Sequence, residues 1–353
     1  MADADNTTSG SLGVLVVNLG TPDEPTAAAV RRYLNEFLSD PRVVEAPRWL
    51  WWLALHGYIL RVRPARSAAA YRKIWTKDGS PLLVYTTQLA DGIRAALARQ
   101  LSAPAIVLPA MSYGSPSMES ALEKMLSEGA DRIIVLPLYP QYSSSTTGSA
   151  FEAVTRVLSQ RRQIPAFHFI DHYYDSPGYV TALAASVREA WGVNGRGDRL
   201  LFSFHGLPRS MVEKGDPYYR QCLETARQLA GTLGLGGEGE WQVSFQSRVG
   251  REEWLRPYTD EVLRELGKQR MRKIDVICPG FAVDCLETLE EIAMQNAERF
   301  TAAGGGELRY IPALNNRNDH VSFLSGLIMT HAAGRHTGSN VVFPPTADAG
   351  ATS

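Results

Sequence analysis

The chain has 353 residues, of which 44% are hydrophobic and 21% are charged, and its formal net charge is −1. This is the composition of a folded globular protein, and the length exceeds what one hydrophobic core normally sustains, so we expect two domains. The near balance of charges excludes a global electrostatic attraction to nucleic acid.

The first half of the chain predicts a series of strands, each followed by turn residues and a helix-compatible stretch. Residues 1–11 are small and polar and lack the basic and apolar segments of a secretory signal, so we expect a flexible tail on a cytoplasmic protein. The β-rich apolar runs that follow are Leu12–Leu19, Ile106–Leu108, Arg132–Leu136 and Phe167–Ile170.

An apolar stretch at Trp49–Leu60 contains clustered tryptophans and leads into the basic segment Arg61–Arg66. About a dozen residues are too few to cross a bilayer. One interpretation is a buried core helix. The other is an exposed apolar lip that faces a flat amphipathic ligand or a membrane surface, with basic side chains beside it.

The second half repeats the same series. Its β-rich runs are Leu200–Phe204, Gln242–Phe245, Ile274–Cys278 and Leu308–Ile311, and they alternate with helical stretches such as Tyr218–Leu233 and Leu286–Phe300. Several matches extend past the strands; in one of them, Asn18-Leu19-Gly20-Thr21-Pro22 occupies the place of Phe204-His205-Gly206-Leu207-Pro208. The shared order indicates an internal duplication.

The duplicated pattern predicts two similar Rossmann-like α/β domains, each a roughly four-stranded parallel sheet flanked by helices. We expect the first domain at residues 12–172 with the apolar lip, the second at 173–336, and another flexible tail at 337–353. No turn carries a nucleotide-binding glycine motif. Ligands of such sheets bind beyond the carboxyl ends of the strands, so we expect a site in the cleft between the domains.

Two candidate catalytic residues lie after strands of the second half. His205 follows an apolar strand and precedes Gly206, which favours an exposed imidazole, although a core histidine fits equally well. Glu287 opens a helix after a Pro-Gly turn, where a plain N-terminal charge on the helix is the simpler interpretation. Glu291 follows on the same helix face, as part of an acidic row or as a solvated residue.

The three cysteines, Cys222, Cys278 and Cys285, form no C-x-x-C pair. An odd number of thiols in a reducing compartment predicts free cysteines rather than disulfides, and structural zinc is not expected. Because no basic residue adjoins Cys278 or Cys285, we expect buried, unreactive thiols.

Taken together, several segments resemble ferrochelatases over residues 13–331. Those of the first half are Asn18-Leu19-Gly20-Thr21-Pro22, Met111-Ser112-Tyr113-Gly114-Ser115-Pro116 and Pro137-Leu138-Tyr139-Pro140-Gln141-Tyr142-Ser143 with Thr146-Thr147-Gly148. Those of the second half are Ser203-Phe204-His205-Gly206-Leu207-Pro208, Gly215-Asp216-Pro217-Tyr218, Phe245-Gln246-Ser247-Arg248-Val249-Gly250 with Trp254, and Cys278-Pro279-Gly280-Phe281 with Asp284 and Leu286-Glu287-Thr288-Leu289.

This resemblance implies a lyase of haem biosynthesis that inserts Fe(II) into protoporphyrin IX, with His205 and Glu287 as the active pair and as metal ligands. Metallation removes two pyrrole protons and strips water from the metal, which a neutral imidazole and a carboxylate suit. Which of the two takes protons is left open. The resemblance also places a further set of residues around the porphyrin: Leu19, Arg63, Tyr71, Ser80, Tyr113, Trp254 and Phe281.

The resemblance implies no organic cofactor, and Fe(II) enters as a substrate. Some family members carry a [2Fe–2S] cluster on four cysteines, but this chain has Ser144 at the cysteine-bearing loop position and no cysteine after Cys285. We therefore expect no cluster. Other members have His at the position of Cys285 and Met or Tyr at Leu19, which leaves the metal route and one porphyrin face open.

Two alternatives stay open. Within the same class, the chain could be a coproporphyrin III ferrochelatase or another tetrapyrrole chelatase. In a different class, it could be a two-lobed protein that binds a tetrapyrrole without turning it over. For the segment Trp49–Arg66 we expect weak peripheral contact with the inner face of the membrane.

Overall fold

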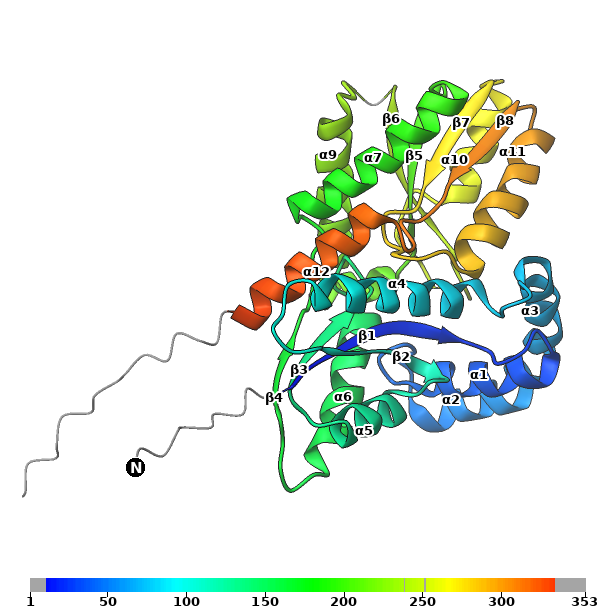
Figure 1. Cartoon of the computed structure of the whole chain (residues 1–353). Helices are drawn as coiled ribbons and strands as arrows, with labels where there is room; N and C mark the ends of the chain where they lie inside the picture. Colours follow the sequence, from blue (N-terminus) through cyan, green and yellow to red (C-terminus); the bar gives the residue numbers. More distant parts are fainter. Residues whose placement is uncertain (1–10, 238, 251, 334–353) are drawn as a thin grey trace, which may run out of the picture.

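The computed structural model describes residues 11–237, 239–250 and 252–333, which form two lobes around two parallel sheets (Figure 1). The first sheet has the order β2-β1-β3-β4 and the second has the order β6-β5-β7-β8. The strands are β1 (Ser11–Thr21), β2 (Ile106–Gly114), β3 (Ala130–Pro137), β4 (Ala166–Phe169), β5 (Arg199–His205), β6 (Trp241–Gln246), β7 (Lys273–Ile277) and β8 (Glu307–Ile311).

All eight predicted strands are present, and the two sheets share one strand order, so the duplication inferred from the sequence is confirmed in the topology. Each sheet is parallel throughout. Parallel strands need crossover helices that cover both faces, which explains why β1 reads as a continuous apolar run: the side chains of Val14, Leu15, Val16 and Val17 are all fully buried.

Fifteen described helical segments connect the strands. Those of the first half are α1 (Ala27–Ser39), α2 (Arg48–Ala54), the π-helix η1 (Leu55–Ile59), α3 (Leu60–Ile74), α4 (Pro81–Ala98), α5 (Met118–Ser127), the π-helix η2 (Ser144–Gly148) and α6 (Ser149–Ser159). Those of the second half are α7 (Pro177–Asn194), α8 (Arg209–Glu213), α9 (Tyr218–Leu233), α10 (Thr259–Lys268), the π-helix η3 (Glu287–Asn296), α11 (Ala297–Ala302) and α12 (Asn318–Ala333).

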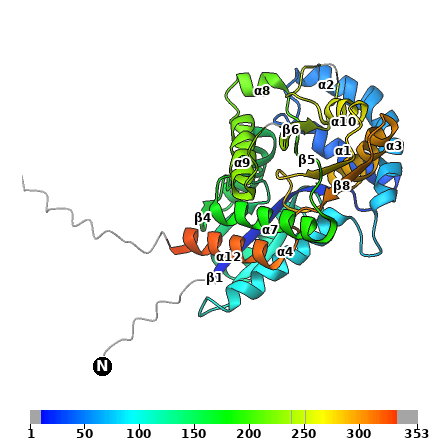
Figure 2. The same cartoon turned by 90° about the horizontal axis from the view of Figure 1, so that it is seen from above.

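The lobes share a core where α4, α7 and α12 lie side by side between the sheets (Figures 1 and 2). One cluster of buried apolar residues includes Leu89 of α4, Leu183 of α7 and Leu324 of α12, and it continues into both sheets. Helix α12 comes last in the described chain, yet it packs on α4 of the first half. It thereby joins the two lobes at the face away from the lip.

The segment Trp49–Leu60 is not a buried core helix. It forms α2, η1 and the start of α3, and the side chains of Trp49, Trp52 and Tyr58 are 71%, 59% and 67% exposed. Trp51 turns inward, where its indole N–H donates to the Leu38 carbonyl at 2.6 Å, and Leu55 and Leu60 are buried in the same apolar cluster. One face of the segment is therefore exposed, as the lip interpretation requires, and the opposite face is buried.

The expected tails fall mostly outside the described residues. Ser11, which we assigned to the first tail, is the first residue of β1 and pairs with Ala130 of β3. Residues 1–10 and 337–353 lie outside the described ranges.

A buried histidine in α12 predicts that the folded protein loses stability in acid. His320 is fully buried, its Nδ1 donates to the Asn315 carbonyl at 2.7 Å, and its Nε2 has no hydrogen-bond partner among the described residues. Burial lowers the pKa of His320 to about 4. The unfolded chain takes up this proton near pH 6.5, so stability is lost as the pH falls from 6.5 towards 4, by at most about 3 kcal/mol.

We therefore expect the variant His320→Asn, which keeps one donor near Nδ1, to flatten the fall of the unfolding free energy between pH 6.5 and 4.5. Urea unfolding at several pH values measures this slope. An equally steep fall in the variant would show that other groups cause the acid sensitivity.

Candidate functional site

His205 is the last residue of β5, where the buried strand reaches the edge of its sheet. Its Nδ1 lies 2.6 Å from the Gly206 carbonyl oxygen. A carbonyl oxygen only accepts, so Nδ1 carries the hydrogen and Nε2 of the neutral ring keeps its lone pair. The ring is half-buried between two aromatic side chains, with centroids 6.4 Å from both Trp254 and Phe281.

Glu287 is the first residue of η3, which follows the loop after β7. The turn of this loop is fixed at Pro279, whose carbonyl accepts from the hydroxyl of Tyr179 at 2.7 Å and from Nε2 of Gln141 at 3.3 Å. The buried carboxylate of Asp284 fixes the second half of the same loop. It accepts from Tyr310, Asn315 and Thr288 at 2.6, 2.7 and 3.0 Å. The backbone that presents Glu287 is therefore held from several elements.

The two candidate residues belong to the same lobe, at the carboxyl ends of adjacent strands. β5 pairs with β7, so His205 and the loop that carries Glu287 emerge at one edge of the sheet. Gln246 connects them, because it is the register partner of His205 and its Nε2 donates to the Glu287 carbonyl at 2.9 Å. Both residues also act electrostatically on the carboxyl of Glu291. The imidazole and the two carboxyl groups thus lie near one another.

A small cavity lies beside Glu287, between the lobes. The first half contributes the end of β1, α1, α3 and the start of α4, and the second half contributes the start of η3. Its lining residues are Leu19, Gly20, Thr21, Tyr33, Tyr71, Ser80, Leu82, Cys285, Leu286 and Glu287. Leu19, Tyr71 and Ser80, three residues assigned from the sequence, therefore lie together with Glu287.

The other residues assigned from the sequence lie outside this lining. Phe281 and Trp254 flank the His205 ring, as described above. Tyr113 packs in the same apolar cluster as Tyr71, and its hydroxyl donates to the Asp40 carboxylate at 2.6 Å. Arg63 is half-buried in α3 and has no ion-pair partner among the described residues. Burial, with the nearby Arg66, lowers the pKa of Arg63.

Several site residues were not identified from the sequence. Tyr33 lines the cavity from α1, where its apolar spacing indicates only a core face. Cys285 lines it beside Glu287, and burial with the adjacent Glu287 raises the pKa of this thiol well above its ordinary value, so it stays protonated. Gln246 and Ser247 contact η3 through side-chain geometry that no local pattern encodes.

Polar contacts tie the lobes together around the cavity. Lys73 of α3 donates to Glu290 of η3 at 2.7 Å. The carboxylate of Asp216 caps one helix in each half, because one oxygen accepts from the backbone N–H of Tyr218 at 3.0 Å and the other from that of Ser144 at 2.7 Å. A carboxylate at two helix N-termini favours one alignment of the lobes.

Across the described ranges, no group of three or more His, Cys, Asp or Glu side chains is arranged to hold a metal ion. His205 and Glu287 offer two ligands, one nitrogen and one oxygen. A divalent metal held by two protein ligands keeps the rest of its coordination shell for water or for another ligand, which suits transfer better than permanent storage.

Comparisons with known proteins identify the family of the chain. The family model "Ferrochelatase" matches residues 11–332. Proteins named ferrochelatase from Thioalkalivibrio sulfidiphilus and Methylococcus capsulatus are 55% and 54% identical, over 92% of this chain and over 87% and 98% of their own lengths. A similar solved structure is SirB from Bacillus subtilis with Fe3+, with a TM-score of 0.55, 14% identity and coverage of 92% of this chain and 96% of SirB. At 14% identity, this similarity shows a shared fold and nothing about function.

Proposed function

This chain belongs to the ferrochelatase family, which inserts iron into porphyrin in haem biosynthesis, and we propose that His205 and Glu287 carry this reaction on protoporphyrin IX. The main support is the shared edge of the second sheet: His205 ends β5, the loop after the adjacent β7 leads to Glu287, and Gln246 bonds to the backbone of Glu287, which lines the cavity between the lobes.

The reaction exchanges two pyrrole N–H protons for one Fe(II), so two protons leave as four iron–nitrogen bonds form. The Gly206 carbonyl holds the proton of His205 on Nδ1, which leaves Nε2 free to accept a pyrrole proton or to ligate iron. Glu287 supplies a carboxylate that suits a divalent cation. The geometry is compatible with either division of the two roles.

The porphyrin would lie between the lobes, against Leu19 from one lobe and against Phe281 and Trp254 from the other. A rigid apolar clamp of this kind can direct binding energy into bending the macrocycle, which exposes the nitrogen lone pairs. The guanidinium of Arg63, which is half-buried and has no ion-pair partner within the described part of the chain, suits a porphyrin carboxylate. Tyr71 and Ser80 line the cavity together with Leu19 and Glu287.

Anaerobic metal insertion tests this function. Fe(II) is mixed with the enzyme and protoporphyrin IX, and the change in the porphyrin absorbance bands gives the rate. Parallel reactions with coproporphyrin III, with a non-porphyrin tetrapyrrole and with Co(II) or Ni(II) compare the alternatives. A clear preference for another macrocycle would overturn the choice of substrate, and tight porphyrin binding without metallation would identify a binding protein instead.

We further propose that the protein works in the cytoplasm, with the lip on the inner face of the membrane. Among the described helices, none combines the length and the apolar character needed to cross a membrane. The lip nevertheless exposes Trp49, Leu50, Trp52 and Leu53 on α2, and the basic residue Arg48 begins this helix. Exposed tryptophans beside cationic side chains favour the interface of an anionic bilayer.

We expect weak, salt-sensitive binding to vesicles that contain anionic phospholipid. The double variant Trp49→Ser/Trp52→Ser should lower the fraction that co-sediments with these vesicles, without a change in metal insertion into a water-soluble porphyrin. Wild-type protein that never sediments with anionic vesicles would contradict this proposal.

A further inference from the structure

His205 and Gly206 are joined by a peptide group whose two polar atoms are both bound. The carbonyl oxygen of His205 accepts from the hydroxyl of Tyr218 at 3.1 Å, and the N–H of Gly206 donates to the carbonyl oxygen of Gln246 at 2.7 Å. The next carbonyl oxygen, that of Gly206, accepts from Nδ1 of His205 at 2.6 Å. The orientation of this one peptide group therefore decides where the Gly206 carbonyl lies relative to the imidazole.

Close packing fixes one side of this peptide group. A Cβ at Gly206 would lie 2.8 Å from the carbonyl oxygen of Gln246 and 3.0 Å from the ring of Trp254, so the backbone passes there only because Gly206 has no side chain. Gln246 is itself bound, because its side chain donates to the Glu287 carbonyl at 2.9 Å. The acceptor of the Gly206 N–H therefore has a fixed position.

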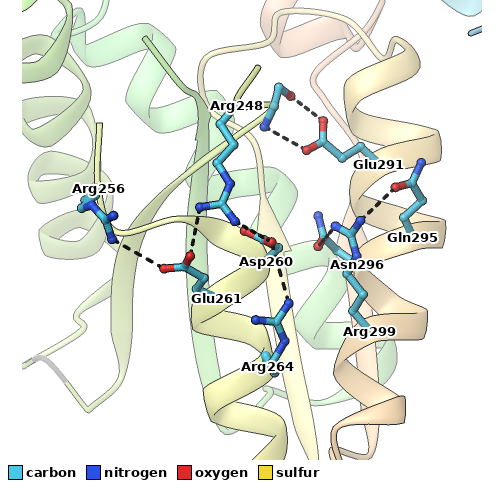
Figure 3. A network of polar contacts seen from close by, with 10 residues as sticks. Arg248, Arg256, Asp260, Glu261, Arg264, Glu291, Gln295, Asn296 and Arg299 are labelled. Atoms are coloured by element: carbon cyan, nitrogen blue, oxygen red, sulfur yellow. Dashed lines mark hydrogen bonds and ion pairs between the residues drawn. The ribbon is translucent and has the colours of Figure 1, made fainter. Parts of the chain in front are cut away.

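The segment that follows β6 is held by a polar network of its own (Figure 3). Ser247, whose φ is 66°, donates from its backbone N–H to Glu291 at 2.9 Å and from its hydroxyl to the same carboxylate. The guanidinium of Arg248 stacks at 4.0 Å over the ring of Tyr258 and donates to Glu261 at 2.9 Å. These contacts fix the end of β6 without any contribution from α9.

Tyr218 supplies the contact on the other side of the peptide group, from the start of α9. Its side chain is buried, and its backbone N–H donates to Oδ1 of Asp216 at 3.0 Å. The other oxygen of Asp216 accepts from Ser143 and Ser144 of the first half at 3.0 and 2.7 Å, so the start of α9 is held from both lobes. Burial raises the pKa of the Tyr218 phenol well above its ordinary value, so the hydroxyl stays protonated and remains a donor.

We propose that Tyr218 is a positioning residue that sets the tautomer of His205. Its hydroxyl holds the His205 carbonyl, and the peptide group fixed in this way keeps the Gly206 carbonyl against Nδ1. The hydrogen then stays on Nδ1 and Nε2 keeps its lone pair, because the bond made by one ring nitrogen decides the state of the other. This inference rests on the proposed function, since it concerns how His205 is prepared for the same reaction. Tyr218 acts through the backbone and takes no part in the reaction itself.

The substitution Tyr218→Phe removes the hydroxyl and keeps the buried ring. Without this donor the peptide group can turn, and the Gly206 carbonyl no longer holds the hydrogen on Nδ1. The ¹⁵N chemical shifts of the ring nitrogens report the tautomer in protein labelled at histidine, at about pH 8.5, where histidines of ordinary pKa are neutral. We expect Nε2 without a hydrogen in the wild type and a mixture of both tautomers in Tyr218→Phe. The signals of His205 are those that disappear in His205→Ala.

The rate of iron insertion supplies a second measurement. The kcat of Tyr218→Phe should fall by about tenfold, the upper effect of one lost neutral hydrogen bond, while the KM for porphyrin stays within about twofold of wild type. Tyr219→Phe is the matched control, because Tyr219 is the next residue of α9 and its ring packs 5.7 Å from that of Phe245. This control should keep the wild-type tautomer and kcat. Gly206→Ala, which displaces the same peptide group from its other side, should alter the tautomer as Tyr218→Phe does.

A wild-type tautomer in Tyr218→Phe would overturn the proposal even if kcat falls, because the hydroxyl would then only stabilise the fold. A changed tautomer with an unchanged kcat would overturn it as well. If Tyr218→Phe does not fold, unaltered ring shifts in Gly206→Ala decide against the proposal in the same way. Failure of the proposed function is distinguishable, because it shows as an absence of metallation in the wild-type enzyme, while the ring shifts still compare wild type with Tyr218→Phe.

Discussion

The substitution His205→Ala should lower the rate of iron insertion by about 10²–10⁴-fold, the range of a positioned proton acceptor. It removes the Nε2 lone pair that the Gly206 carbonyl leaves free. Trp254 and Phe281, which flank the ring, remain, so porphyrin should still bind. Single-turnover metallation measures the rate, and quenching of tryptophan fluorescence measures porphyrin binding.

Glu287→Gln should have an effect of similar size, because an amide neither accepts a proton at neutral pH nor binds a divalent cation as a carboxylate does. If the two residues act as one unit, the double variant should lose little more than either single variant. His172→Ala is the control, because His172 lies just after β4 of the first sheet and its partly exposed ring contacts Asp171. Wild-type rates in His205→Ala would remove the physical basis of the proposed mechanism.

The strands could be predicted because each is a short apolar run between turn residues, and the repeated order of these runs predicted two equivalent sheets. The lip could not be assigned in the same way. The apolar residues of Trp49–Leu60 indicate that this segment contacts other apolar groups. They do not show whether those groups belong to the interior of the protein or to another molecule. Only the positions of Trp49 and Trp52 in space show that this surface is exposed.

At the site, the sequence predicted which residues follow the ends of strands. It did not predict the tertiary contacts that fix those residues in place. His205 and Glu287 were candidates because both follow apolar strands at a break in the chain, and the resemblance to ferrochelatases selected them as the active pair. Ser247 was not, because its left-handed φ and its two bonds to Glu291 depend on a segment 44 residues away. Likewise, the wide π-helical turns of η3 have no distinct sequence period with which to predict them.

Gly20→Ala should be among the most destabilising single substitutions in the chain, with a loss of about 3–5 kcal/mol of unfolding free energy. Gly20 has a φ of 114°, and a Cβ there would lie 1.7 Å from the carbonyl oxygen of Tyr113. These two residues are register partners in β1 and β2. The clash is therefore between two backbones, and no side-chain rotation relieves it.

Gly79→Ala is the matched control for this substitution. Gly79 has a φ of 117°, close to that of Gly20, but a Cβ there meets nothing within 4 Å. Its replacement should cost only the backbone strain, about 1–3 kcal/mol. Denaturant unfolding of both variants separates strain from clash. Equal losses would mean that β1 and β2 separate easily, whereas a larger loss for Gly20→Ala, with weaker porphyrin binding, would show that their close approach fixes Leu19 and Thr21 at the cavity.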